Sequence, residues 1–221
     1  MPVIGITGGI ATGKSLVAAS FRKQGAVVFS ADEAAREVVR PGSLALQQIA
    51  DAFGPGFLHP DGSLDRAALG RLIFASPEAR HRLDQITHPP ILERLRSQIQ
   101  EAQAQPPALS SLSTHAIRTL IAVETPLLYE AGMENWFDHI VVVAVPEATQ
   151  IARLCQRDRC SPEEARLRIA AQMPLAEKLA RADYVLWNNE ASDAVLRQEA
   201  VDREVKGLLD RWLNDAPDAG A

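Results

Sequence analysis

The sequence lacks the features that mark secreted and membrane-spanning proteins. Cys155 and Cys160 are its only two cysteines and neither has a histidine beside it, so we expect reduced thiols rather than disulfides or a zinc site. There is no run of about 18 apolar residues, which argues against a membrane-spanning helix. The first apolar run leads directly into a glycine-rich loop, so we expect no secretory signal and a cytoplasmic protein.

An excess of positive charge is also missing. The 221 residues include 23 Lys and Arg against 28 Asp and Glu, which gives a net charge of −5 at pH 7. Nucleic acids and anionic membranes bind broad basic faces, so we expect neither as a main partner, and nothing indicates an obligate protein partner. An anionic small molecule remains a candidate ligand, because one local cluster of basic side chains can bind it.

Residues 8–15, Gly-Gly-Ile-Ala-Thr-Gly-Lys-Ser, match the phosphate-binding pattern G-x-x-x-x-G-K-[ST]. Backbone N–H groups of such a loop surround phosphate oxygens, Lys14 adds a charge for the outer phosphates, and Ser15 offers a hydroxyl to nucleotide-bound magnesium. The apolar run 3–6 before the loop predicts a buried strand. Residues 16–23 predict a helix whose N-terminus meets the phosphates.

Five short apolar segments predict the strands of one sheet, at residues 3–6, 26–29, 120–123, 140–145 and 184–187. They alternate with helices, which indicates an α/β fold with a doubly wound parallel sheet, where ligands bind outside the carboxyl ends of the strands. We expect a nucleotide-binding core over 1–42 and 119–213 with a helical lid at about 147–178, a helical insertion over 43–104, a loop over 105–118 and a disordered tail over 214–221.

Local sequence signals such as prolines and capping residues predict the bounds of the helices. In the insertion they cover 43–53, 65–74, 77–87 and 91–104, with the His88-Pro89-Pro90 segment interrupting the last two. In the lid, Ser161 and Glu164 form a capping box that predicts a second helix after the one over 147–158. A final amphipathic helix is expected over 193–212.

Two acids follow predicted strands at the edge where a ligand would bind. Asp32 comes three residues after the second strand, where its carboxylate can accept a proton from an attacking hydroxyl or can cap the following helix. Glu124 ends the third strand, where it can hold magnesium or its waters, or can be a partly solvated carboxylate. The residues alone leave both choices open.

Basic residues gather in the predicted lid, namely Arg153, Arg157, Arg159, Arg166, Arg168 and Lys178. Two helices joined by a short polar turn can close over phosphates, and arginines there neutralise charge on a transferring phosphoryl group. For any single arginine a solvated helical face is the simpler interpretation, whereas the cluster as a whole favours phosphate contact. A lone histidine such as His88 is more often a structural hydrogen-bonding residue than a catalyst.

In their order along the chain these segments resemble the dephospho-coenzyme A kinases, over about residues 3–190. The phosphate loop alone is generic, and the series as a whole is specific. The matching segments are residues 6–15, Ser30-Ala31-Asp32 with Ala35-Arg36, Asp61-Gly62-Ser63-Leu64-Asp65-Arg66, Thr87-His88-Pro89 with Ile91, Pro126-Leu127-Leu128-Tyr129-Glu130, Gln172-Met173-Pro174, Glu177-Lys178, Ala182-Asp183-Tyr184 and Asn188.

The resemblance implies transfer of the ATP γ-phosphoryl group, with Mg²⁺, to the ribose 3′-hydroxyl of dephospho-coenzyme A, which gives coenzyme A and ADP. It implies that Asp32, Lys14 and Arg157 are catalytic and that the insertion binds the acceptor. It implies ATP contacts from Gly8, Gly9, Ile10, Ala11, Thr12, Gly13, Lys14, Ser15, Leu16, Arg153, Arg157 and Asn188. Acceptor contacts would come from Asp32, Arg36, His88, Leu127 and Glu130, and magnesium contacts from Ser15 and, through water, Glu124.

The chain departs from the family pattern at three positions near the phosphates. Ser30 stands where the family usually has a first aspartate, so the role of base carries over to Asp32 alone. Leu16 replaces a common threonine, which removes a supporting hydroxyl. Ala11 replaces a frequent glycine, which is tolerable if its φ is negative.

Three other functions compete with this interpretation. Another small-molecule P-loop kinase, such as a nucleoside monophosphate kinase, would differ in its acceptor segments. A nucleotide-dependent switch would use a D-x-x-G motif, but Asp51-Ala52-Phe53-Gly54 lies on a predicted helix and no Asn-Lys-x-Asp motif is present. A degenerate nucleotide binder would not need Lys14, Ser15 and Asp32.

Overall fold

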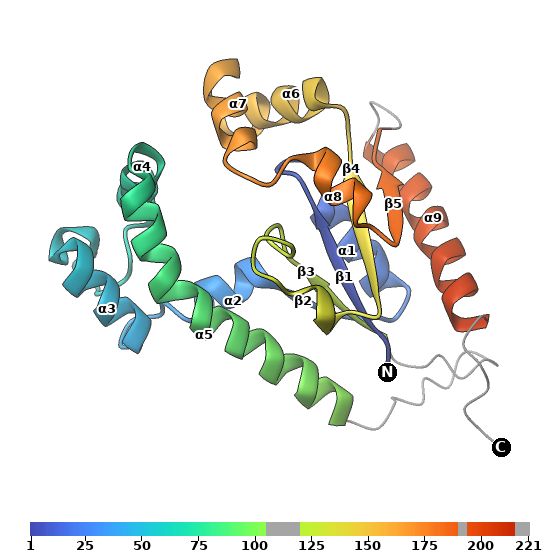
Figure 1. Cartoon of the computed structure of the whole chain (residues 1–221), viewed down its shortest axis with the longest axis horizontal. Coiled ribbons are helices and arrows are strands. Elements are labelled where there is room, and N and C mark those ends of the chain that lie inside the picture. The colour runs from blue at the N-terminus through green and yellow to red at the C-terminus, as the bar shows by residue number, and fades with distance from the viewer. Residues whose placement is uncertain (105–119, 190–193, 215–221) are drawn as a thin grey trace. The chain divides into compact units, whose positions relative to one another are not determined.

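The chain folds into two compact units in a computed structural model, which describes residues 1–104, 120–189 and 194–214. The sheet unit comprises residues 1–29 and the described residues from 120 onward, and the helical unit comprises residues 30–104 (Figure 1). By their contacts residues 30–42 group with the helical unit, whereas the sequence analysis assigned them to the core.

One five-stranded sheet has the strand order β2-β3-β1-β4-β5, and the registered pairs β1–β3, β1–β4 and β4–β5 are parallel. The doubly wound α/β fold expected from the alternation of strands and helices is confirmed, and each strand lies within two residues of its predicted bounds. The strands are β1 (Val3–Gly8), β2 (Val27–Ser30), β3 (Ile121–Glu124), β4 (His139–Ala144) and β5 (Tyr184–Trp187).

Helices α1 (Lys14–Lys23) and α9 (Ala194–Asn214) share one apolar core with the sheet. Phe21 from α1 and Val205 from α9 are fully buried there, against Ile6 of β1 and Val141 of β4. Because β1 and α1 both contribute to this core, the loop that joins them has fixed ends. The position of the phosphate loop therefore follows from the packing of the sheet unit.

The segment predicted as a lid, about 147–178, begins with two helices after β4, and both start where the sequence predicts them. Helix α6 (Glu147–Asp158) ends at Arg159, which has a φ of +52°, and α7 (Pro162–Ala170) starts at the capping box of Ser161 and Glu164. A short helix that the sequence analysis missed, α8 (Leu175–Ala180), leads back to β5. A 3₁₀ turn, η2 (Glu134–Trp136), precedes β4.

The helical unit has a core of its own, formed by Val39, Ala45, Ile49 and Leu69. Its elements are α2 (Ala31–Glu37), α3 (Leu44–Phe53), the 3₁₀ turn η1 (Pro55–Phe57), α4 (Arg66–Ala75) and α5 (Pro77–Ala104). Ser43 caps α3 and Asp65 caps α4, each through a hydrogen bond from a backbone N–H of the first turn.

The predicted break at Pro89-Pro90 is wrong, because α5 runs without interruption through both prolines. Proline has a φ that suits a helix, so its cost lies in lost hydrogen bonds and crowding of the preceding turn. Packing on both sides of the prolines offsets that cost. Leu83 and Ile86 pack against the core before them, and Leu95 is fully buried after them.

Two further expectations concern the chain's less regular parts. Asn214, expected to start a disordered tail, instead ends α9. The predicted loop over 105–118 and the rest of that tail, 215–221, lie outside the described residues.

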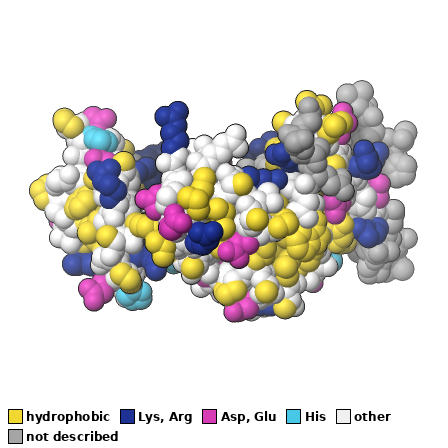
Figure 2. Space-filling model, turned by 90° about the horizontal axis from the view of Figure 1, so that it is seen from above, with side chains coloured by type: hydrophobic (Ala, Val, Ile, Leu, Met, Phe, Trp, Pro, Cys, Tyr) yellow, Lys and Arg dark blue, Asp and Glu magenta, His cyan; other side chains and the backbone are white. Residues whose placement is uncertain are grey.

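Charge is mixed over the surface shown in Figure 2, where Lys and Arg side chains are interspersed with Asp and Glu. Within the described ranges, no helix is long and apolar enough to cross a membrane.

The burial of Phe21 in the core of the sheet unit can be tested through the stability of substituted variants. Phe21 has an exposed fraction of 0%, so Phe21→Ala should lower the free energy of unfolding by about 3–5 kcal/mol in a denaturant titration. Phe74 on α4 is 49% exposed, and Phe74→Ala should cost less than about 1 kcal/mol. Equal losses in the two variants would contradict the burial of Phe21.

Candidate active site

The phosphate loop joins β1 to α1, and its backbone conformation requires glycine at two positions. Gly8 and Gly13 have φ values of +146° and +93°. A Cβ atom at Gly8 would collide with the carbonyl oxygen of Val143, and one at Gly13 would collide with the side chain of Asn188. Any other residue at these positions would therefore distort the loop as well as strain its own backbone.

Ala11 does not meet the condition under which alanine would be free of strain, a negative φ, because its φ is +60°. This left-handed conformation costs an L-residue roughly 1–2 kcal/mol, so it persists only where surrounding contacts hold the backbone. At this position the alanine carries strain that a glycine would avoid.

Side chains from distant elements bond to the loop backbone and supply such contacts. Gln150 of α6 donates from Nε2 to the carbonyl of Ile10 at 2.8 Å, and Gln172 accepts from the N–H of Ile10 at 2.8 Å. Asn188, after β5, donates from Nδ2 to the carbonyl of Thr12 at 2.8 Å. The loop is thus held from three separate segments.

Arg153 of α6 also lies against this loop. Its Nη1 is 3.4 Å from the carbonyl oxygens of both Ala11 and Thr12, and its Nη2 donates to the carbonyl of Asn188 at 2.9 Å. Burial lowers the pKa of Arg153, and the nearby charge of Arg197 lowers it further. Its guanidinium donates to loop carbonyls, so it supports the loop from the α6 side.

Lys14 and Ser15 are the two loop residues whose side chains were predicted to contact the phosphates and magnesium. The Nζ of Lys14 donates to the carbonyls of Gly8 and Gly9 at 3.3 and 2.9 Å. The hydroxyl of Ser15 donates to Oε1 of Glu124 at 2.7 Å. Parallel pairing of β1 with β3, in which Ile6 faces Glu124, brings this acid to the loop.

Two other predicted lid residues, Arg157 and Arg168, share the carboxylate of Asp158 at the end of α6. Nε of Arg157 lies 2.8 Å from Oδ1 of Asp158, and Arg168 lies 2.6 Å from the second oxygen of the same carboxylate. The hydrogen bond from Arg157 is the largest of the effects that lower the pKa of the Asp158 carboxyl group. The side chain of Arg157 is 59% exposed.

Glu130 belongs to an internal ion pair. Its Oε1 lies 2.8 Å from Nζ of Lys178, whose side chain is fully buried, and the same lysine donates to the carbonyl of Pro126 at 2.7 Å. The N–H of Met173 also donates to Glu130. Lys178, counted among the lid cations in the sequence, therefore lies inside the sheet unit and cannot contact a bound phosphate from this position.

Leu127, another predicted acceptor contact, is partly exposed, and its neighbour Leu128 is fully buried. Tyr129 donates from its hydroxyl to the carbonyl of Arg181 at 2.9 Å, and burial raises the pKa of this phenol to about 12. The 126–130 segment is thus fixed by internal contacts on both sides of Leu127.

Three predicted residues lie in the helical unit. Asp32 is exposed in the first turn of α2, and the N-cap position of that helix is Ser30, so the capping interpretation of Asp32 is wrong. Arg36 is also exposed, four residues further along α2. His88 on α5 places its Nε2 3.6 Å from Oδ1 of Asp84.

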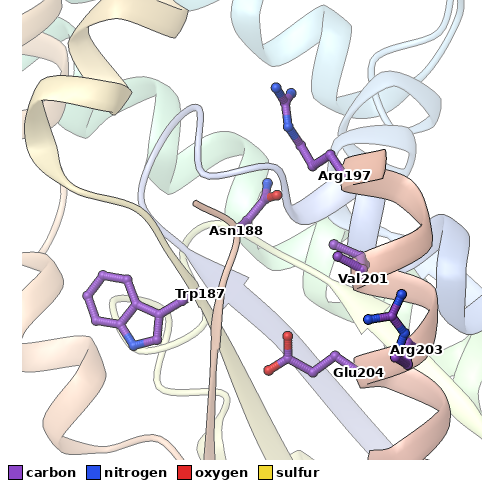
Figure 3. Close-up of a pocket in the computed structure, with 7 residues that line it drawn as sticks. Trp187, Asn188, Arg197, Val201, Arg203 and Glu204 are labelled. Atoms are coloured by element: carbon purple, nitrogen blue, oxygen red, sulfur yellow. The ribbon is translucent and has the colours of Figure 1, made fainter. Parts of the chain in front are cut away.

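A pocket of about 220 Å³ lies between the end of β5 and α9 in the sheet unit, and one of its lining residues, Asn188, bonds to the phosphate loop. In Figure 3, Asn188 stands at the end of β5 and faces Arg197 and Val201 on α9, while Trp187 points to the other side of the strand. Among the described residues, Oδ1 of Asn188 is buried without a hydrogen-bond partner. A ligand that donates a hydrogen bond could satisfy this acceptor.

Sequence reasoning missed the contribution of Gln150 and noted Gln172 only as part of a family pattern. The one local indication for Gln150 is its position four residues before the fully buried Leu154. This spacing puts its polar side chain on the buried side of α6. The bonds themselves join residues 140 and 162 positions apart, which no local pattern reveals.

The loop between β1 and α1, with its serine bonded to the acid at the end of β3, places the protein in the class of P-loop kinases. In this class such loops hold the phosphates of a nucleotide, and an acid at the end of a neighbouring strand holds the accompanying cation or its waters. A family model described as dephospho-CoA kinase matches residues 2–193. The chain belongs to the dephospho-CoA kinase family, as the ordered motifs indicated.

Relatives and solved structures cover nearly the whole chain. A dephospho-CoA kinase of Geobacillus kaustophilus is 43% identical over 209 residues, which is 95% of this chain and 96% of that protein. A structure from Thermus thermophilus has a TM-score of 0.72 at 32% identity and covers 95% of this chain and 97% of its own. A dephospho-CoA kinase from Campylobacter jejuni has a TM-score of 0.65 at 25% identity, covering 95% and 98%.

The positive φ of Ala11 can be tested by substitution, with a control substitution that should change the free energy of unfolding in the opposite direction. Ala11→Gly should raise the free energy of unfolding by about 1 kcal/mol, because glycine adopts a positive φ without strain. Ala19→Gly in the exposed face of α1 should lower it by about 0.5–1 kcal/mol. Thermal unfolding of both variants checks this, and a loss in both would show that Ala11 is not strained.

Proposed function

We propose that this chain transfers the γ-phosphoryl group of ATP to the ribose 3′-hydroxyl of dephospho-coenzyme A, which produces coenzyme A and ADP. The observation that carries the proposal is the phosphate loop with its Ser15–Glu124 hydrogen bond, in a chain of this family. ATP as the donor points to action in the cytoplasm.

In this proposal the loop residues 8–16 hold the phosphates of ATP. Lys14 exchanges its bonds to the loop carbonyls for phosphate oxygens, where its charge stabilises the transferring group. Arg153 holds the loop in shape from α6, and Arg157 of the lid covers the phosphates. The unpartnered Oδ1 of Asn188 suits the exocyclic amine of adenine, a hydrogen-bond donor.

The donor atoms beside the loop fit magnesium. Ser15 and Glu124 present a hydroxyl and a carboxylate oxygen 2.7 Å apart, and Mg²⁺ prefers such oxygen ligands together with water and phosphate. Ser15 would bind the ion directly and Glu124 through a water. When bound, the ion supplies positive charge to the β- and γ-phosphates.

Asp32 is the proposed base that orients or deprotonates the 3′-hydroxyl. Its exposed carboxylate is not used as a helix cap. Arg36 and His88, also in the helical unit, and Leu127 and Glu130, in the sheet unit, are the other proposed acceptor contacts. For Glu130 the contact would have to coexist with its ion pair to Lys178.

The acceptor is tested by incubating the protein with Mg·ATP and a panel of dephospho-coenzyme A, AMP, CMP and free nucleosides. We expect phosphate transfer only to dephospho-coenzyme A, with the product identified by its 3′-phosphate. Much faster transfer to AMP or CMP would overturn the proposal in favour of a nucleoside monophosphate kinase.

The phosphate loop is tested by Lys14→Ala, which should lower kcat by at least about 10²-fold through the loss of charge at the transferring group. Lys23→Ala is the matched control, because this lysine ends the same helix with a side chain 67% exposed and paired with Asp202. In steady-state kinetics the control variant should have the kcat of the wild type. A folded Lys14 variant with normal turnover would refute the assignment.

The role of base is tested by Asp32→Asn, which keeps the shape of the side chain and removes its basic oxygen. General-base assistance is worth about 10²- to 10⁴-fold, so kcat should fall by at least roughly 10²-fold with thermal stability nearly unchanged. Glu33→Gln is the control, since Glu33 is the other exposed acid in the first turn of α2. If both variants kept full activity, the base would be another group.

A further inference from the structure

Two glutamines hold the backbone of Ile10, the loop residue directly before Ala11, from both sides. Gln172, between α7 and α8, accepts from the N–H of Ile10 at 2.8 Å, and Gln150 of α6 donates to the carbonyl of Ile10 at 2.8 Å. Both distances are typical of strong hydrogen bonds between amide groups. We call this pair of bonds the Ile10 clamp. Neither backbone group of Ile10 can turn without breaking one of them.

The side chain of Gln150 is placed for this contact. Gln150 is only 2% exposed, and a buried amide is unfavourable unless it is hydrogen-bonded. A Cβ atom at Gly9 would collide with this amide, so the missing side chain of Gly9 gives Gln150 access to Ile10. The burial and the contact therefore belong together.

The clamp acts on the conformation of Ala11. The carbonyl of Ile10 and the N–H of Ala11 belong to one planar peptide group, so a bond to this carbonyl fixes the plane before the Cα atom of Ala11. Nη1 of Arg153 lies 3.4 Å from the carbonyl oxygen of Ala11, in the peptide group after that Cα atom. Gln150 and Arg153 are three positions apart on one face of α6. One helix therefore holds both planes whose rotation defines φ and ψ of Ala11.

The left-handed conformation of Ala11, with a φ of +60°, affects where the N–H groups of the loop point. In phosphate loops, successive N–H groups converge on an anion because left-handed residues turn the backbone between them. Glycine adopts such a conformation about as readily as one with a negative φ, whereas alanine does not. A loop with alanine at this position therefore depends on outside contacts for its shape when no nucleotide is bound.

We propose that Gln150 and Gln172 are positioning residues for the phosphates of ATP, and that this chain depends on them because residue 11 is alanine. Without the clamp, Ala11 relaxes to a negative φ and its N–H turns away from the phosphate site. A nucleotide must then restore the shape of the loop, which lowers its affinity. This inference rests on the proposed function and names residues that shape its nucleotide site.

The binding of Mg·ADP, measured by isothermal titration calorimetry, tests the clamp without an acceptor. Gln172→Ala should weaken the affinity by about 5- to 30-fold, the factor that corresponds to the cost of a left-handed alanine. Gln172 is partly exposed, so this variant should fold, and Gln150→Leu should weaken the affinity by a similar factor. Gln156→Leu, at an exposed glutamine of α6, is the matched control and should bind as the wild type does.

Repeating the two substitutions in an Ala11→Gly background separates positioning from a purely structural role. Glycine adopts a positive φ without the clamp, so Gln172→Ala should weaken the affinity by no more than about 2- to 3-fold relative to the Ala11→Gly parent. A purely structural role would give the same loss in both backgrounds, because it would not depend on residue 11. Equal losses, or folded clamp variants with the wild-type affinity, would overturn the inference.

Steady-state kinetics provide a second measurement. With alanine at residue 11, Gln172→Ala should raise the KM for ATP by a factor similar to the loss of Mg·ADP affinity. The KM for dephospho-coenzyme A should stay unchanged, because both bonds of the clamp go to the phosphate loop. An equal rise in the two KM values would indicate a general distortion of the fold and would overturn the inference.

Failure of the inference and failure of the proposed function are distinguishable in these measurements. If the wild type binds Mg·ADP and phosphorylates another acceptor, the proposed function is wrong, while the binding measurements still decide the role of the clamp. If the wild type phosphorylates dephospho-coenzyme A and the clamp variants bind Mg·ADP as the wild type does, only the clamp is wrong.

Discussion

The bracing of the phosphate loop by side chains from distant segments is the constraint on which the rest of the sheet unit depends. Gly8, Ala11 and Gly13 all have a positive φ, and for Ala11 that conformation is unfavourable by itself. Hydrogen bonds from Gln150, Gln172 and Asn188 to the loop backbone hold it in place. A loop shaped before the nucleotide arrives loses less conformational entropy when phosphate binds.

The same bonds connect the loop to the predicted lid segment at two points. Gln150 and Arg153 lie on α6, and Gln172 follows α7. The next residue, Met173, donates to Glu130, which is paired with the buried Lys178. A continuous set of polar contacts thus runs from the loop to the 126–130 segment. Removing Glu130 would leave the charge of the buried Lys178 without its carboxylate partner.

The competing functions differ in how well they fit this arrangement. Asp51 and Gly54, which match the motif of a nucleotide switch, lie within and at the end of α3 in the helical unit and not at a strand end. The Ser15–Glu124 pair and the intact loop argue against a degenerate nucleotide binder, because both groups would serve no purpose without a nucleotide and its cation. Acceptor recognition is the remaining difference between kinases of this class, and the match to the dephospho-CoA kinase family separates this chain from the nucleoside monophosphate kinases.

The sequence by itself determined the features that depend on neighbouring residues: the phosphate loop, the five strands, the bounds of α6 and the capping box at Ser161, since each rests on contacts within a few positions. The tertiary structure decided the rest. Whether α5 continues through Pro89 and Pro90 depends on packing before and after them, and whether Ala11 is left-handed depends on the bonds that hold its loop. The supports at Gln150 and Gln172 and the pair of Glu130 with Lys178 join residues far apart in the chain. Such contacts become visible only when the chain has folded, because they are set by distance in space and leave no periodic signal in the sequence.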